Sequence, residues 1–187
     1  AGAGVQWLRD RMKFFKKAPE TEKIVKSLKD NNDIYLVPAF TGLGAPYWNA
    51  NARGVLSGIT RDTSPKEIVR AIIEAVAYQT YDLFEAMKHD GLRPKIVKVD
   101  GGMVMNNWFS QFLSDIVNVK VLRPKVQETT ALGAAFMAGL HIGVYKSLKD
   151  ISKNWQLDKK FSSKMKNSSR NILIDGWEKA VKRALIN

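Results

Sequence analysis

A short apolar run that ends in two glycines constrains the fold of this chain more than any other stretch. The run Ile96–Val99 is mostly β-branched, and its length suits a buried strand better than a helix. Gly101 and Gly102 end it. Apolar residues then recur at the spacing of one helix face, at Phe109, Phe112, Leu113 and Ile116. The stretch therefore predicts a strand, a glycine turn and a helix.

A glycine turn before a helix can hold a nucleotide. Glycine lets the backbone approach a ligand closely, and a helix start offers free N–H groups and the positive end of its dipole. On its own the pattern is weak, because two glycines after a strand commonly form only a tight turn. Asp100 fits two interpretations equally, either as a strand-end residue bonded to nearby backbone N–H groups or as a ligand.

A second glycine-rich helix start lies at the beginning of the sequence. Gly2 and Gly4 precede a helical pattern over residues 5–15. We therefore expect a nucleotide to be held between two helix starts, residues 2–6 and residues 100–106. This pairing is a hypothesis that only the three-dimensional arrangement can test.

The remaining pattern indicates an α/β protein. Strands and helices alternate from Ile96 onward, which predicts parallel strands there. Ser64, Pro65 and Glu67 form a capping box at the start of a long helix, and Asn118 is expected to end a later helix in the left-handed conformation. Residues 161–171 have no hydrophobic pattern and are expected to form an exposed surface segment. Further helices are expected at 19–28, 129–140 and the C-terminus, and strands at 34–39, 55–59 and 119–122.

Composition excludes several kinds of chemistry and leaves one alternative open. The 187 residues contain no cysteine, so disulfides and thiolate catalysis are excluded. This absence of cysteine fits a cytoplasmic protein. No apolar run has the length of a membrane span, and no signal peptide is recognisable. The net charge of +12 raises the possibility of a basic, non-enzymatic module that binds nucleic acid. The lysines are scattered in ones and twos, however, which favours a solvated surface and no nucleic-acid partner.

Several motifs resemble those of a known enzyme family. The loop Phe40–Trp48 closely resembles the glycerol kinase signature of the FGGY carbohydrate kinases. Residues 99–102 with Asn106 and Asn107 look like the adenosine motif of the actin-like ATPase superfamily. Further matches to these kinases lie at residues 2–10, 52–61, 67–74 and 129–135.

The resemblance implies a fold and a nucleotide site. It covers almost the whole chain, and it implies that residues 1–187 form a ribonuclease H-like (actin-like ATPase) C-terminal domain that lacks its first strands. The implied ligands are ATP and Mg²⁺. Gly2, Gln6, Gly102 and Asn106 match family residues that contact the nucleotide, and Gly101 belongs to the same motif.

The resemblance also implies what this chain does not contain. Family members with the glycerol kinase signature phosphorylate glycerol, and their catalytic aspartate and glycerol pocket lie in an N-terminal domain that has no counterpart here. We therefore expect no catalytic residue and no metal ligand in this chain. We expect it to be an interior piece of a longer, homo-oligomeric enzyme, and to be inactive alone. Xylulose and gluconate kinases are the alternative members of the family.

Overall fold

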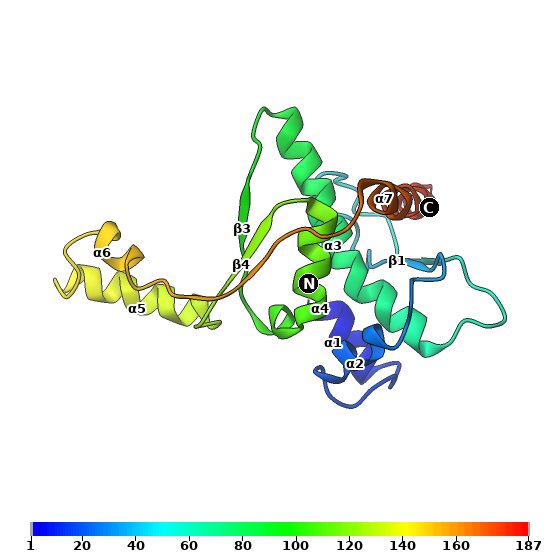
Figure 1. Ribbon diagram of the computed structural model, residues 1–187, viewed down its shortest axis with the longest axis horizontal. Coiled ribbons are helices and arrows are strands. Elements are labelled where there is room, and N and C mark those ends of the chain that lie inside the picture. The colour runs from blue at the N-terminus through cyan, green and yellow to red at the C-terminus, as the bar shows by residue number, and fades with distance from the viewer. Residues whose placement is uncertain (1, 187) are drawn as a thin grey trace.

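A long central helix organises the molecule. In the computed structural model, which describes residues 2–186, helix α3 (Pro65–His89) runs through the centre (Figure 1). The elements that pack against it are α1 (Gly2–Asp10), α2 (Glu20–Lys26), α4 (Asn107–Val117) and β1 (Tyr35–Val37). Its start confirms the predicted capping box. The Ser64 hydroxyl accepts a hydrogen bond from the Lys66 amide at 3.2 Å, and the Glu67 carboxylate accepts one from the Ser64 amide at 2.9 Å. The helix is therefore fixed at its N-terminus by its own sequence.

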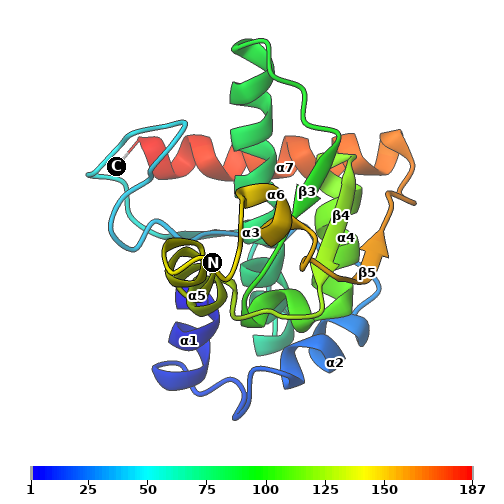
Figure 2. The ribbon, with the colours of Figure 1, turned by 90° about the vertical axis from the view of Figure 1, so that its left-hand side faces the viewer.

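Helices α1 (Gly2–Asp10) and α2 (Glu20–Lys26) pack near the first half of α3 (Figure 2). Helix α1 ends earlier than the predicted residue 15, because Lys13 takes a left-handed conformation with φ of 60° that turns the chain. A Cβ atom on Gly4 would lie 2.5 Å from Ile72 Cγ1. Gly4 thus allows α1 to approach α3 closely.

Two small sheets flank this helical centre. Strands β1 (Tyr35–Val37) and β2 (Val55–Ser57) form an antiparallel pair, and β3 (Ile96–Lys98) pairs in parallel with β4 (Lys120–Pro124). The parallel arrangement predicted after residue 96 is confirmed for this pair. It is wrong for β5 (Leu157–Phe161), which runs antiparallel to β4. Three charged residues interrupt the apolar pattern of β5, and its pairing with β4 determines its conformation.

The glycine turn leads to its helix through an extra element. A 3₁₀ turn, η1 (Gly102–Met105), lies between the glycines and helix α4 (Asn107–Val117). The Asn106 side chain caps α4 by accepting a hydrogen bond from the Phe109 amide at 3.0 Å. Asn118 ends α4 with a φ of 54°, as predicted. The α-helix thus begins five residues after Gly102, and a 3₁₀ turn forms the immediate continuation of the glycines.

The last third of the chain forms an arm and a long helix. Helices α5 (Thr129–His141) and α6 (Leu148–Ser152) project away from the rest of the molecule (Figure 1). Helix α7 (Asn167–Leu185) packs back against β1 and β2. The prediction that residues 161–171 form an exposed segment is therefore wrong near both ends. Phe161 is buried at the end of β5, and Arg170 is buried in α7 with its Nε donating to the Asp115 carbonyl.

The core lies where α3, α4, α7 and β1 meet. Trp177 of α7 is fully buried and stacks on Tyr78 of α3 with a centroid distance of 5.3 Å. The Tyr78 ring also meets Phe112 of α4 edge-on at 5.6 Å. This aromatic cluster fixes the helices relative to one another. None of the helices described for residues 2–186 is long and apolar enough to cross a membrane.

Candidate functional site

A cavity of about 460 Å³ lies between α1 and the glycine turn. The five residues predicted to bind a nucleotide all line it, although two of them come from the start of the chain and three from its middle. These residues are Gly2, Gln6, Gly101, Gly102 and Asn106. The structure therefore brings together the two glycine-rich segments that the sequence pairs only as a hypothesis.

The two glycines of the turn have different roles. Gly101 has a φ of 83°, a conformation that favours glycine, and its amide donates to the Gln127 carbonyl at 3.2 Å. Gly102 has no such backbone requirement. A Cβ atom on Gly102 would meet no protein atom within 4 Å, and the residue is exposed in the cavity wall. Gly101 therefore shapes the turn, while the missing side chain of Gly102 leaves space inside the cavity.

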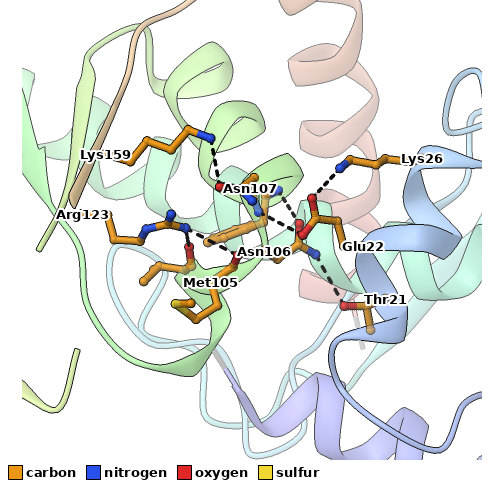
Figure 3. Close-up of polar contacts among 10 residues, drawn as sticks. Thr21, Glu22, Lys26, Met105, Asn106, Asn107, Arg123 and Lys159 are labelled. Carbon is orange, nitrogen blue, oxygen red and sulfur yellow. Dashed lines mark hydrogen bonds and ion pairs between the residues drawn. The ribbon is translucent and has the colours of Figure 1, made fainter. Parts of the chain in front are cut away.

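Asn106 joins the turn to helix α2. Its side-chain oxygen caps α4, and its Nδ2 lies 3.4 Å from the Thr21 hydroxyl, to which it donates (Figure 3). The side chain is thereby held at the edge of the cavity by contacts on both sides. An amide in this position can present a donor to a ligand ring.

Glu22 places a negative charge at the same wall. Its carboxylate accepts hydrogen bonds from Lys26 Nζ at 2.5 Å and from the Asn107 amide at 3.3 Å (Figure 3). Partial burial alone would raise the pKa of Glu22. The two hydrogen bonds and the positive charges of Lys26 and Lys159 outweigh burial, so the pKa lies below its ordinary value. Glu22 is therefore ionised at neutral pH.

Asp100 also lines the cavity, and its carboxylate accepts a hydrogen bond from the Thr129 hydroxyl at the start of α5. The Asp100 carboxylate is therefore bonded to a side chain of the next helix, whereas one interpretation of the sequence has it bonded to nearby backbone N–H groups. The contact ties the mouth of the cavity to the base of the α5–α6 arm.

The sequence did not reveal the contribution of α2. Thr21 and Glu22 lie 85 residues before their partners Asn106 and Asn107. No local motif marks them, because a polar first turn is ordinary for any solvated helix. Only the packing of α2 against α4 identifies them as part of the wall.

The arrangement suits binding of a flat, partly polar molecule. Val5, Ile73, Met103 and Met105 supply apolar surface to the lining, and Gln6 and Asn106 add polar groups. Among residues 2–186, no three His, Asp or Glu side chains converge in a way that could hold a metal ion. The cavity lining combines glycine backbone, amides and apolar side chains with the charged side chains of Arg9, Glu22 and Asp100.

Comparison with known proteins identifies the family of this chain. A model of the FGGY family of carbohydrate kinases, C-terminal domain, matches residues 1–142. The chain is 55% identical over 183 residues to glycerol kinase 1 of Pseudomonas aeruginosa. The aligned region covers 98% of this chain and 37% of that protein. The chain thus spans little more than a third of that relative.

Solved structures agree in fold. The chain matches glycerol kinase of Plasmodium falciparum with ADP at a TM-score of 0.87 and 37% identity, over 100% of this chain and 37% of that one. It matches xylulose kinase of Lactobacillus acidophilus at a TM-score of 0.75 and 25% identity, over 94% and 35% of the two chains. The predicted actin-like ATPase fold is confirmed by these matches. The chain belongs to the FGGY family of carbohydrate kinases and corresponds to its C-terminal domain.

Proposed function

We propose that residues 1–187 bind ATP and ADP in this cavity as the nucleotide-binding part of a glycerol kinase. The observation that carries the proposal is the convergence of Gly2, Gln6, Gly102 and Asn106 on one cavity. Its apolar walls suit an adenine ring, and the glycine turn leaves room for the rest of the nucleotide. The similarity to a glycerol kinase that was solved with ADP supports the same ligand.

Glycerol is the proposed acceptor of the γ-phosphoryl group. Identity to the glycerol kinase of Pseudomonas aeruginosa is 55%, whereas identity to the solved xylulose kinase is 25%. Phosphoryl transfer depends mainly on positioning the two substrates and stabilising charge. We assign the nucleotide side to this chain, and we assign glycerol binding and catalysis to the portion of the relatives that the chain does not match.

Mg²⁺ would accompany ATP in such a reaction. The donor set of this chain does not fit a resident metal site, since no three His, Asp or Glu side chains converge among the described residues. We therefore propose no Mg²⁺ ligand in residues 2–186. The role proposed for these residues is to hold and orient the nucleotide.

Replacing Gly102 tests the nucleotide site. In Gly102→Leu the new Cβ atom meets no protein atom within 4 Å, and the rest of the side chain should extend into the cavity. The fold is therefore expected to remain while ADP binding falls about tenfold or more. ADP affinity is measured by isothermal titration calorimetry, and folding by circular dichroism and thermal unfolding.

Gly133→Leu is the matched control. Gly133 lies in α5 outside the cavity, and a Cβ atom there also meets no atom within 4 Å. We expect this variant to bind ADP like the unmodified chain. Equal ADP affinity in the folded Gly102→Leu variant would refute the proposed site.

A further inference from the structure

Arg123 is a buried cation directly behind the cavity wall. It lies on β4 with 6% of its surface exposed, and it does not line the cavity itself. Its Nη1 donates to the Val104 carbonyl at 2.7 Å and to the Met105 carbonyl at 3.4 Å (Figure 3). A buried arginine that serves two carbonyls of one short turn fixes where that turn lies.

The turn it holds is the wall of the nucleotide site. A 3₁₀ turn satisfies few of its own carbonyl groups, so η1 depends on outside donors. Ser110 supplies one donor, with its hydroxyl 2.9 Å from the Val104 carbonyl, and Arg123 supplies the other. The residues on the cavity side of this turn are Gly102, Met103, Met105 and Asn106.

Two residues of β5 hold the guanidinium in place. The Arg123 Nε donates to Asp158 Oδ2 at 2.7 Å, and the guanidinium carbon lies 5.6 Å from the centre of the Phe161 ring. Asp158 is 39% exposed at its side chain, so it compensates the buried charge from the rim of the sheet. Strand β5 therefore reaches the site through Arg123 without touching the cavity.

We propose that Arg123 is a positioning residue for nucleotide binding, oriented by Asp158, that acts by fixing the Val104 and Met105 carbonyls and hence the glycine turn. This inference rests on the proposed function of the cavity. It assigns to the antiparallel strand β5 a role in ligand affinity as well as in the sheet.

Three substitutions test the role of Arg123 by ADP titration of the whole chain. Arg123→Ala is expected to weaken ADP binding about tenfold, the usual effect of losing a charged hydrogen bond. Arg123→Lys should lie between the unmodified chain and Arg123→Ala, because a single ammonium cannot serve both carbonyls and Asp158 in the same geometry. Asp158→Asn should weaken binding about threefold, since the arginine remains but loses its charged partner.

Val121→Ala is the control for general destabilisation. Val121 lies on the same strand and is fully buried, and its truncation lowers stability while leaving the side-chain hydrogen bonds to the Val104 and Met105 carbonyls in place. Below its unfolding temperature this variant should bind ADP normally. Hydrogen exchange gives a readout that needs no ligand: the Asn106 amide, bonded to the Met103 carbonyl at 3.2 Å, should exchange faster in Arg123→Lys and Asp158→Asn but not in Val121→Ala.

The outcomes separate the two claims. If the unmodified chain does not bind ADP, the proposed function fails, whatever the variants do. If it binds ADP and the folded Arg123→Lys and Asp158→Asn variants match it in both affinity and exchange, the positioning role is refuted. The same conclusion follows if Val121→Ala weakens ADP as much as the arginine variants do.

Discussion

At the scale of single residues, Asp82 is a buried carboxyl group whose pKa is raised by folding into this structure. It lies in α3 with 7% of its surface exposed, and it accepts a hydrogen bond from Trp177 Nε1 at 2.9 Å. Burial raises the pKa of Asp82 to about 6, and the nearby charge of Glu178 adds to that rise, while Trp177 and Tyr47 oppose it. At neutral pH the folded protein therefore carries a largely buried negative charge.

This raised pKa predicts how stability depends on pH. Between the ordinary value and about 6, the folded state binds more protons at Asp82 than the unfolded state does. The contribution of Asp82 to the free energy of unfolding therefore rises as pH falls through 6. Asp82→Asn lacks this titration, so we expect its stability relative to the unmodified chain to drop by about 1 kcal/mol between pH 7 and pH 5. Urea unfolding at the two pH values measures the difference.

The exposed residue Asp62 supplies the control for Asp82. The relative stability of Asp62→Asn should change little over the same pH interval, because substitution at an exposed position leaves the buried charge in place. A relative stability of Asp82→Asn that stays constant or increases from pH 7 to pH 5 would contradict a raised pKa.

Residues with a local signal could be predicted, and residues recruited by packing could not. Gly102 and Asn106 stand in one short motif, and the turn and cap that they form depend on neighbours within a few residues. Thr21 and Glu22 have no such motif, because their roles arise only when α2 packs against α4. Arg123 likewise gains its role from a strand pairing that no local pattern specifies.

At the scale of elements, the packing of α7 on β1 requires a glycine. A Cβ atom on Gly176 would lie 2.2 Å from the Tyr35 hydroxyl oxygen and 2.3 Å from its Cζ atom. Tyr35 is itself buried, so neither element can move aside without disturbing the core. We expect Gly176→Ala to lower the free energy of unfolding by about 1–3 kcal/mol through overpacking.

The same substitution in α5 should raise the free energy of unfolding. Gly133→Ala introduces no contact and removes the cost of glycine in a helix, so we expect a gain of up to about 1 kcal/mol. Denaturant unfolding of both variants compares the two positions directly. Similar effects of the two substitutions would show that α7 does not pack closely on Tyr35.

The elements differ in how far sequence determines them. Helix α3 could be predicted because its capping box and apolar face are local. Strand β5 could not, because Asp158, Lys159 and Lys160 carry no strand pattern and the pairing partner β4 lies more than thirty residues earlier. The start of α7 could not be predicted for a related reason, since the bonds that hold Arg170 include the distant Asp115 carbonyl and Asn118 side chain.

At the scale of the whole molecule, the α5–α6 arm presents apolar surface to solvent. Met137, Ile142 and Leu148 are 54%, 73% and 65% exposed. Within residues 2–186, β3 also has only one paired edge, since the sheet order is β3–β4–β5. Exposed apolar surface and an open strand edge both favour association. The oligomeric state predicted from the sequence stays a prediction.

We expect the chain to associate as its concentration rises, and charged residues on the arm to oppose this. Met137→Glu combined with Leu148→Glu should shift sedimentation velocity profiles toward the monomer. Leu92→Glu is the control, because Leu92 is 63% exposed and lies beyond the end of α3, outside the arm. The expectation is contradicted if the chain stays monomeric over a roughly 100-fold range of concentration. It is also contradicted if Leu92→Glu shifts the profile as much as the double substitution does.

The most direct test of the nucleotide site is to map ADP onto the chain by NMR. The amide signals should shift on titration with ADP for residues 2–6 and 101–106, which form the two sides of the cavity. Smaller shifts should reach Thr21 and Glu22 across the wall. Shifts confined to other regions would contradict the account, for example shifts around a separate cavity lined by Tyr47 and Tyr81 or shifts scattered over surface lysines.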